Sequence, residues 1–241
     1  VNQYYYRFRI RKLFEALHSQ FSISSIKAAI QQPIYRYGFL PQTGLVGLLP
    51  YFTQVLKHFP KAEPQFYLLL SPSGGGKTSF LIQLYNKIAL LSLGRGKVLL
   101  LSLTDPDVLR RLEEYPSAER TVLLLDGLDE DPHMVQDFVS RLDEVLMYTK
   151  DFRHVIMACE PRWFPQVEST EDNTITYIGE ECLQHFQICE LVPMDEGSTR
   201  THVAKKNGKK TAQALDAHIE AWPALSEYPV WATVLAAQEA G

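Results

Sequence analysis

The segment that most constrains this chain is an abrupt change from apolar to glycine-rich sequence in residues 66–78, FYLLLSPSGGGKT. Glycine adopts backbone angles that other residues resist, so three consecutive glycines permit a tight loop whose N–H groups converge. Such a loop binds anions. Helical periodicity begins at about Lys77, and the free N–H groups and positive dipole end of a helix would lie at the same place. Together these features predict a cradle for polyphosphate.

Residues 71–78 match the nucleotide-binding pattern G-x-x-x-x-G-K-[ST] at every fixed position but the first, where Ser71 replaces glycine. In this pattern the loop N–H groups and the lysine hold phosphates, and the hydroxyl after the lysine binds Mg²⁺. We therefore expect a nucleotide bound with Mg²⁺. The residues expected to contact the nucleotide from this loop are Ser71, Ser73, Gly74, Gly75, Gly76, Lys77, Thr78 and Ser79.

A second apolar run, residues 121–126, is followed by an acidic cluster in the sequence TVLLLDGLDED. A buried strand ending at Asp126 would deliver this carboxylate to the sheet edge where the glycine-rich loop lies, and there it can hold Mg²⁺. Carboxylates just past the strand end can orient and deprotonate an attacking water. A solvated turn is the competing interpretation, and the preceding apolar strand argues against it. We predict Thr78 and Asp126 as metal ligands, and Glu130, Asp129 and Lys77 as catalytic residues.

Apolar runs alternate with helical segments along residues 61–193. Alternation of strands with helices is typical of a parallel sheet with helices on both faces. We predict an α/β fold, a P-loop NTPase domain with a five-stranded parallel sheet flanked by helices. A helical N-terminal lead-in, residues 1–60, precedes it, and a small helical domain begins at residues 194–241. The strands are expected at residues 66–71, 97–103, 121–126, 154–159 and 186–192.

The composition of the chain bears on its cellular compartment and on its contacts with nucleic acid and membranes. The three cysteines, Cys159, Cys182 and Cys189, lack the C-x-x-C spacing of metal or redox sites, so we expect structural thiols in a reducing, cytoplasmic setting. No uncharged apolar run approaches the roughly 18 residues of a membrane span. The net charge of −4 and this lack of a span do not indicate nucleic-acid or membrane contact. The chain begins at Val1, and we expect a fragment of a longer protein whose missing domains bind protein partners.

The sequence LLLDGLDE at residues 123–130 resembles the extended acidic motif of NACHT-type ATPases, which belong to the signal-transducing (STAND) P-loop ATPases and are AAA+-related. The resemblance covers about residues 66–235. It implies that residues 154–167 contain the sensor strand of that family, and that Pro229 contacts adenine from the small helical domain. The local sequence is also what a helix start requires, so both interpretations of Pro229 stay open.

One position departs from the family pattern. An arginine usually follows the sensor strand directly, whereas this chain has Glu160 there and Arg162 two residues later. A carboxylate cannot replace a guanidinium near phosphate, because like charges repel. Either Arg162 contacts the nucleotide through a shifted loop, or the γ-phosphate is sensed poorly.

The resemblance implies a nucleotide-dependent switch. ADP would hold a closed monomer, ATP would open it for homo-oligomerisation, and Mg²⁺-dependent hydrolysis, expected to be slow in isolation, would reset it. Two alternatives stay open, an AAA+-type motor or loader ATPase and a nucleotide-stabilised scaffold without useful catalysis. The lack of an Asn-Lys-x-Asp sequence disfavours a GTPase, and the pair Asp129 and Glu130 disfavours a small-molecule kinase.

Overall fold

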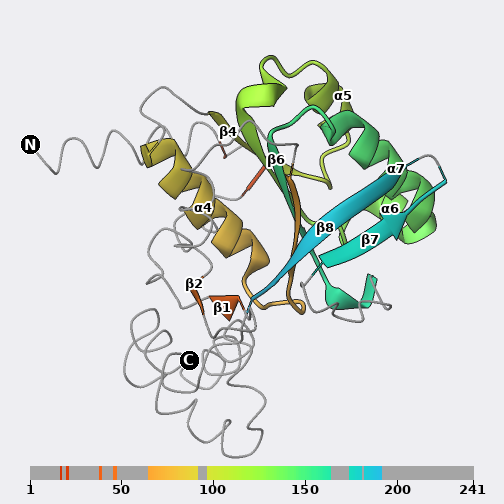
Figure 1. Ribbon diagram of the computed structural model, residues 1–241, viewed down its shortest axis with the longest axis horizontal. Coiled ribbons are helices and arrows are strands. Elements are labelled where there is room, and N and C mark those ends of the chain that lie inside the picture. The colour runs from red at the N-terminus through yellow and green to blue at the C-terminus, as the bar shows by residue number, and fades with distance from the viewer. Residues whose placement is uncertain are drawn as a thin grey trace, which may run out of the picture.

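The structure, a computed structural model, places the centre of the chain in a layered α/β arrangement (Figure 1). The helical domain predicted at residues 194–241, with Pro229, and most of the predicted lead-in lie outside the described residues. The residues that the structure describes are 17, 20–21, 38–39, 46–47, 65–91, 97–163, 174–180 and 182–191.

A six-stranded sheet in the order β4-β5-β6-β3-β8-β7 forms the middle layer. The first five strands in that order are parallel to one another, which confirms the predicted parallel strands, and β6 lies between β3 and β5. The strands are β3 (Gln65–Leu70), β4 (Lys97–Ser102), β5 (Thr121–Asp126), β6 (His154–Cys159), β7 (Thr174–Ile178) and β8 (Leu183–Glu190).

The sheet has one strand more than the sequence predicts. β7 pairs antiparallel with β8 at the edge, with Ile178 opposite Leu183. This pairing extends β8, which begins at residue 183 rather than at the expected 186. Short strands with alternating exposed and half-buried residues, as in β7, lack the continuous apolar run by which the other strands are predicted. A separate antiparallel pair joins β1 (Gly38–Phe39) to β2 (Val46–Gly47).

Helices cover both faces of the sheet (Figure 1). Helix α4 (Lys77–Leu91) lies on one face, and the helices α5 (Val108–Glu113), α6 (Pro132–Gln136) and α7 (Phe138–Thr149) lie on the other. Two single-turn 3₁₀ helices, η1 (Ala118–Arg120) and η2 (Pro161–Trp163), precede β5 and follow β6. No helix in the described part of the chain has the length and apolar character needed to cross a membrane.

Residues 132–149 form two helices, α6 and α7, rather than one. Asp131 caps α6 by accepting a 2.9 Å hydrogen bond from the His133 N–H, with Pro132 at the first helical position. At Asp137 the backbone is extended, and its side chain accepts a 3.1 Å hydrogen bond from the Ser140 N–H. Asp137 therefore ends one helix and caps the next.

Alternate residues of each strand point to opposite faces and build two cores. On the α4 face, Tyr67 and Leu69 of β3 pack with Phe80 of α4. On the other face, Leu68 of β3 packs in a cluster that includes Leu142 of α7. The side chains of both cores are buried. This is expected for strands whose sequence is almost continuously apolar and which helices cover on both faces.

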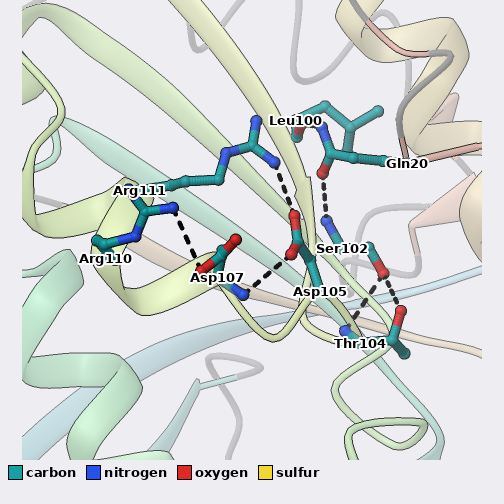
Figure 2. Close-up of polar contacts among 8 residues, drawn as sticks. All are labelled: Gln20, Leu100, Ser102, Thr104, Asp105, Asp107, Arg110 and Arg111. Atoms are coloured by element: carbon teal, nitrogen blue, oxygen red, sulfur yellow. Dashed lines mark hydrogen bonds and ion pairs between the residues drawn. The ribbon is translucent and has the colours of Figure 1, made fainter.

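Residues far from the sheet in sequence close part of its edge. The Gln20 side chain accepts a 2.9 Å hydrogen bond from the Ser102 N–H and donates a 3.2 Å hydrogen bond to the Leu100 carbonyl, as a neighbouring strand would (Figure 2). Leu17 and Phe21 lie in the core cluster on the α4 face. The edge strand β4 is thus covered along part of its length, which limits pairing with other chains.

Candidate nucleotide-binding site

The carboxyl ends of β3, β5 and β6 meet at one edge of the sheet, because the three strands are parallel and adjacent. Backbone hydrogen bonds join the segments that follow them. The Ser71 N–H donates to the Cys159 carbonyl at 3.2 Å, and the Leu128 N–H donates to the Ala158 carbonyl at 3.2 Å. The glycine-rich loop, the acidic segment after Asp126 and the end of the predicted sensor strand are therefore brought together.

The glycine-rich loop needs all three of its glycines. Gly74 and Gly76 have φ values of 78° and 95°, in the left-handed region that favours glycine. A Cβ on Gly75 would overlap the Ser71 hydroxyl and would lie 3.0 Å from the Pro72 carbonyl oxygen. Ser71, which replaces the first glycine of the pattern, thus occupies space that the absent side chain of Gly75 leaves free.

Helix α4 begins at Lys77, directly after the loop, as the sequence predicts. Its first turn carries Thr78 and Ser79, both half-buried, while Ser73 lies exposed in the loop. The Phe80 N–H donates to the Gly76 carbonyl at 2.9 Å, so the helical hydrogen bonds start within the loop. The N–H groups of the first turn face the loop, as the pattern requires for phosphate binding.

The Lys77 side chain is buried and held at two points. Its ammonium donates to the Ser71 carbonyl oxygen at 3.0 Å and lies 3.6 Å from Asp129 Oδ2. The side chains of Lys77 and Asp129 are only 8% and 5% exposed. A buried ammonium beside a glycine-rich loop provides a full positive charge where a phosphate would bind.

The Asp126 side chain is buried and accepts a hydrogen bond from the Thr78 hydroxyl. Burial raises the pKa of the Asp126 carboxyl from its usual 3.8 to about 6, and the Thr78 hydrogen bond opposes this increase. The negative charges of Glu130 and Asp129 add to the increase, and Lys77 opposes it. The surroundings of Asp126 therefore contain too little positive charge to stabilise its ionised form, and a bound cation would supply that charge.

Thr78 and Asp126 fit the requirements of Mg²⁺. This ion takes oxygen ligands and is commonly held by one or two carboxylates together with substrate phosphates. Among the described residues, no three His, Cys, Asp or Glu side chains lie close enough to hold a metal ion by themselves. Mg²⁺ at this place would thus depend on phosphate oxygens as well as on the protein.

The two acidic residues after Gly127 face different surroundings. The Glu130 side chain is exposed, whereas Asp129 points inward, where its Oδ1 accepts a 3.2 Å hydrogen bond from the Glu160 N–H. Gly127 has a φ of 76° and permits the tight turn in which the Glu130 N–H donates to its carbonyl at 3.0 Å. Glu130 can therefore reach solvent water, and Asp129 links the loop to the end of β6.

Glu160 and Arg162, the residues at the position where the family pattern fails, pair with each other. Arg162 Nε lies 2.6 Å from Glu160 Oε2, and the side chains are 74% and 12% exposed, respectively. Arg162 lies on η2, directly after β6. Its charge is thus partly neutralised by its neighbour.

Sequence reasoning missed two contacts of this site, the Ser71 carbonyl as acceptor for Lys77 and the Glu160 N–H as donor to Asp129. Both involve backbone groups, which every residue has, so no residue pattern could have indicated them.

The cysteines are free thiols within the described residues, with Cys159 and Cys189 buried and Cys182 half-buried. Burial raises the pKa of the Cys159 and Cys189 thiols well above its usual range, as is typical of structural thiols.

The loop, the adjacent helix and the sheet together define this chain as an α/β domain with a P-loop nucleotide-binding fold. No family model matches it, and no curated protein matches it. The Aeropyrum pernix ORC1 protein, solved in complex with DNA, is similar at 13% identity and a TM-score of 0.49, over 82% of this chain and 59% of that one. This chain thus spans about 59% of the length of that protein.

Two further solved structures are similar. Domain III of the Thermotoga maritima replication initiation protein DnaA is 15% identical, with 74% of this chain and 83% of that one covered and a TM-score of 0.40. AMPPCP-bound DnaA from Aquifex aeolicus is 14% identical, with 70% of this chain and 54% of that one covered and a TM-score of 0.35. These values do not decide a function, and the DNA and AMPPCP belong to those proteins. None of the comparisons identifies the chain as a NACHT or STAND protein.

Proposed function

We propose that this chain is the ATP- and ADP-binding regulatory module of a NACHT/STAND-type signalling ATPase, in which nucleotide state controls homo-oligomerisation. The observation that carries nucleotide binding is the buried Lys77 ammonium beside a loop of three glycines, at the start of helix α4. Loop N–H groups, the helix N-terminus and a lysine together form a strong phosphate site.

The residues of this chain have separate tasks in the proposed reaction. Lys77 and the loop from Ser71 to Gly76 hold the phosphates in place. Thr78 and Asp126 would hold Mg²⁺, which would supply positive charge to the phosphate oxygens. Glu130 is exposed at the end of the acidic segment and accepts a proton from the attacking water. Pro229 remains our expected contact to adenine.

Slow turnover is part of the proposal. Stabilisation of the transition state of phosphoryl transfer relies on positive charge around the γ-phosphate. At the end of β6 this chain has Glu160, and the nearby Arg162 is paired with it at 2.6 Å. Such a pair offers the γ-phosphate little net positive charge, which favours ADP over ATP and slows hydrolysis.

The test combines three measurements on purified protein. Mass spectrometry after denaturation identifies the nucleotide that the protein retains, calorimetry gives the affinities for ATP, ADP and GTP, and phosphate release gives the turnover rate. Retained ADP at near-stoichiometric amount, with slow turnover, would support the switch. Steady rapid turnover would favour the AAA+-type motor or loader, and bound nucleotide without hydrolysis would favour a scaffold.

A further inference from the structure

The Asp129 carboxylate joins two parts of the candidate site through its two oxygens. Oδ2 lies 3.6 Å from the Lys77 ammonium, and Oδ1 accepts a 3.2 Å hydrogen bond from the Glu160 N–H. The side chain is only 5% exposed. A buried carboxylate loses its solvation by water, so these two contacts largely determine where it lies.

A phosphate at the glycine-rich loop would compete with Asp129. Lys77 has one ammonium, and in the proposed function this group binds phosphate. The negative charge of Asp129 favours the present position of Lys77 and would repel a phosphate placed beside it. Nucleotide binding therefore has to weaken the contact between Asp129 and Lys77.

The other contact of Asp129 leads to the turn after β6. Glu160 begins this turn, its carbonyl accepts a 3.2 Å hydrogen bond from the Trp163 N–H, and its carboxylate pairs with Arg162. The Trp163 ring stacks on Phe138 of α7, with ring centroids 5.6 Å apart and an angle of 22° between the planes. Residues 160–163 are thus held as one unit between Asp129 and the start of α7.

We propose that Asp129 is a positioning residue that couples phosphate at Lys77 to the turn formed by residues 160–163. This inference rests on the proposed nucleotide binding. In the free protein Asp129 holds both Lys77 and the turn. When phosphate takes the Lys77 ammonium, Asp129 loses one of its two partners, and the turn and the Trp163 ring shift with it. A change of nucleotide at the glycine-rich loop thereby alters the turn at residues 160–163. The contact that connects the two is the one between Asp129 and the Glu160 N–H, which lies outside the loop.

Two substitutions separate the charge of Asp129 from its hydrogen bond. Asp129→Asn removes the charge but keeps an oxygen that can accept from the Glu160 N–H. We expect it to bind ADP and ATP about 3- to 30-fold more tightly than the parent, because Lys77 is no longer held by an opposite charge. Asp129→Ala removes both contacts, and we expect it to alter the surroundings of Trp163 even without nucleotide.

The experiment uses protein labelled with 5-fluorotryptophan, in which ¹⁹F NMR reports on each tryptophan and Trp163→Phe assigns the resonance of Trp163. Spectra are recorded without nucleotide and with saturating ADP or ATP, and affinities are measured by calorimetry. Asp151→Asn, the same change at an exposed position between α7 and β6, is the matched control. We expect the Trp163 resonance to shift on nucleotide binding in the parent and in the control.

The outcomes separate this inference from the function on which it rests. A parent protein that binds neither ADP nor ATP contradicts both. If the parent binds nucleotide but its Trp163 resonance does not move, the coupling is wrong and the proposed function stands. The coupling is also wrong if Asp129→Asn, with the melting temperature of the parent, binds nucleotide more weakly, because Asp129 then assists binding. A Trp163 resonance in free Asp129→Ala identical to that of the parent would likewise overturn it.

Discussion

The ammonium of Lys77 donates a 3.0 Å hydrogen bond to the backbone carbonyl oxygen of Ser71. This bond joins the first residue of the glycine-rich loop, directly after β3, to the first residue of helix α4. The side chain expected to bind phosphate thus also stabilises the loop in the free protein. Substitutions in the loop will therefore change both nucleotide binding and stability, which calorimetry and unfolding experiments measure separately.

Lys77→Ala should weaken ATP and ADP binding by about 10- to 150-fold, because a charge-assisted contact to phosphate worth roughly 1.5–3 kcal/mol is lost. It should also lower the melting temperature, since Asp129 then stays buried without its cation. Calorimetry and thermal unfolding check the two effects. Lys87→Ala, a lysine further along α4, is the control and should bind nucleotide as the parent does. Affinity within about twofold of the parent in Lys77→Ala would refute the phosphate site.

Gly75→Ala should destabilise the domain by about 1–3 kcal/mol and impair nucleotide binding, because the new methyl group would overlap the Ser71 hydroxyl. Ser71→Gly removes that hydroxyl, so the double variant should recover part of the loss. Recovery will be incomplete, since the Pro72 carbonyl oxygen still lies 3.0 Å from the new Cβ. Chemical denaturation of all four proteins in the cycle measures the coupling. Strictly additive effects would mean that the loop shifts instead of retaining this contact.

Asp126→Asn should raise the stability of the domain at neutral pH and reduce the dependence of nucleotide binding on Mg²⁺. Burial raises the pKa of Asp126 to about 6 in the folded protein, so its contribution to stability is fully present below about pH 3.8 and is lost as the pH rises through 6. Above pH 6 the ionised, buried carboxylate lowers the free energy of unfolding by about 1–3 kcal/mol. The asparagine variant without nucleotide should therefore be more stable than the parent at pH 7.5, and its nucleotide affinity should respond little to Mg²⁺.

The matching measurements are unfolding curves between pH 4 and 8 and nucleotide titrations with and without Mg²⁺. Equal stability of the two proteins across this range would show that the Asp126 carboxyl stays well solvated in the folded protein. An unchanged response to Mg²⁺ would remove Asp126 from the metal site.

His154 should make the protein sensitive to acid. Burial, and secondly the charge of Arg153, lower the pKa of this imidazole from 6.5 to about 4. The stability that His154 contributes is therefore present above pH 6.5 and is lost as the pH falls through 4, by about 1–3 kcal/mol. An NMR titration of the ring protons gives the pKa directly. His154→Leu should flatten the acid side of the stability curve, whereas a curve that is only displaced, with the same slope, would contradict the assignment.

The residue pattern was sufficient for the elements whose signals are local. The parallel strands are predicted from continuous apolar runs, and the start of α4 from the end of the glycines. The cap of α6 at Asp131 follows from an aspartate before a proline. The division of the following helix at Asp137 was not predicted, because an aspartate within a helical pattern becomes a cap only where the backbone turns. The strand β7 was missed because its stability depends on pairing with β8.

The sequence by itself determined that the glycine-rich loop, the following helix and the strand ending at Asp126 belong to one α/β domain, since these features depend on backbone sterics and short-range periodicity. Only the tertiary structure decided which of the neighbouring acidic residues faces Lys77. Asp129 and Glu130 are adjacent in sequence, yet one is buried against the ammonium and the other is exposed. The difference arises because β6 lies between β3 and β5 and brings the Glu160 N–H to Asp129, a placement that depends on strand order across the whole sheet.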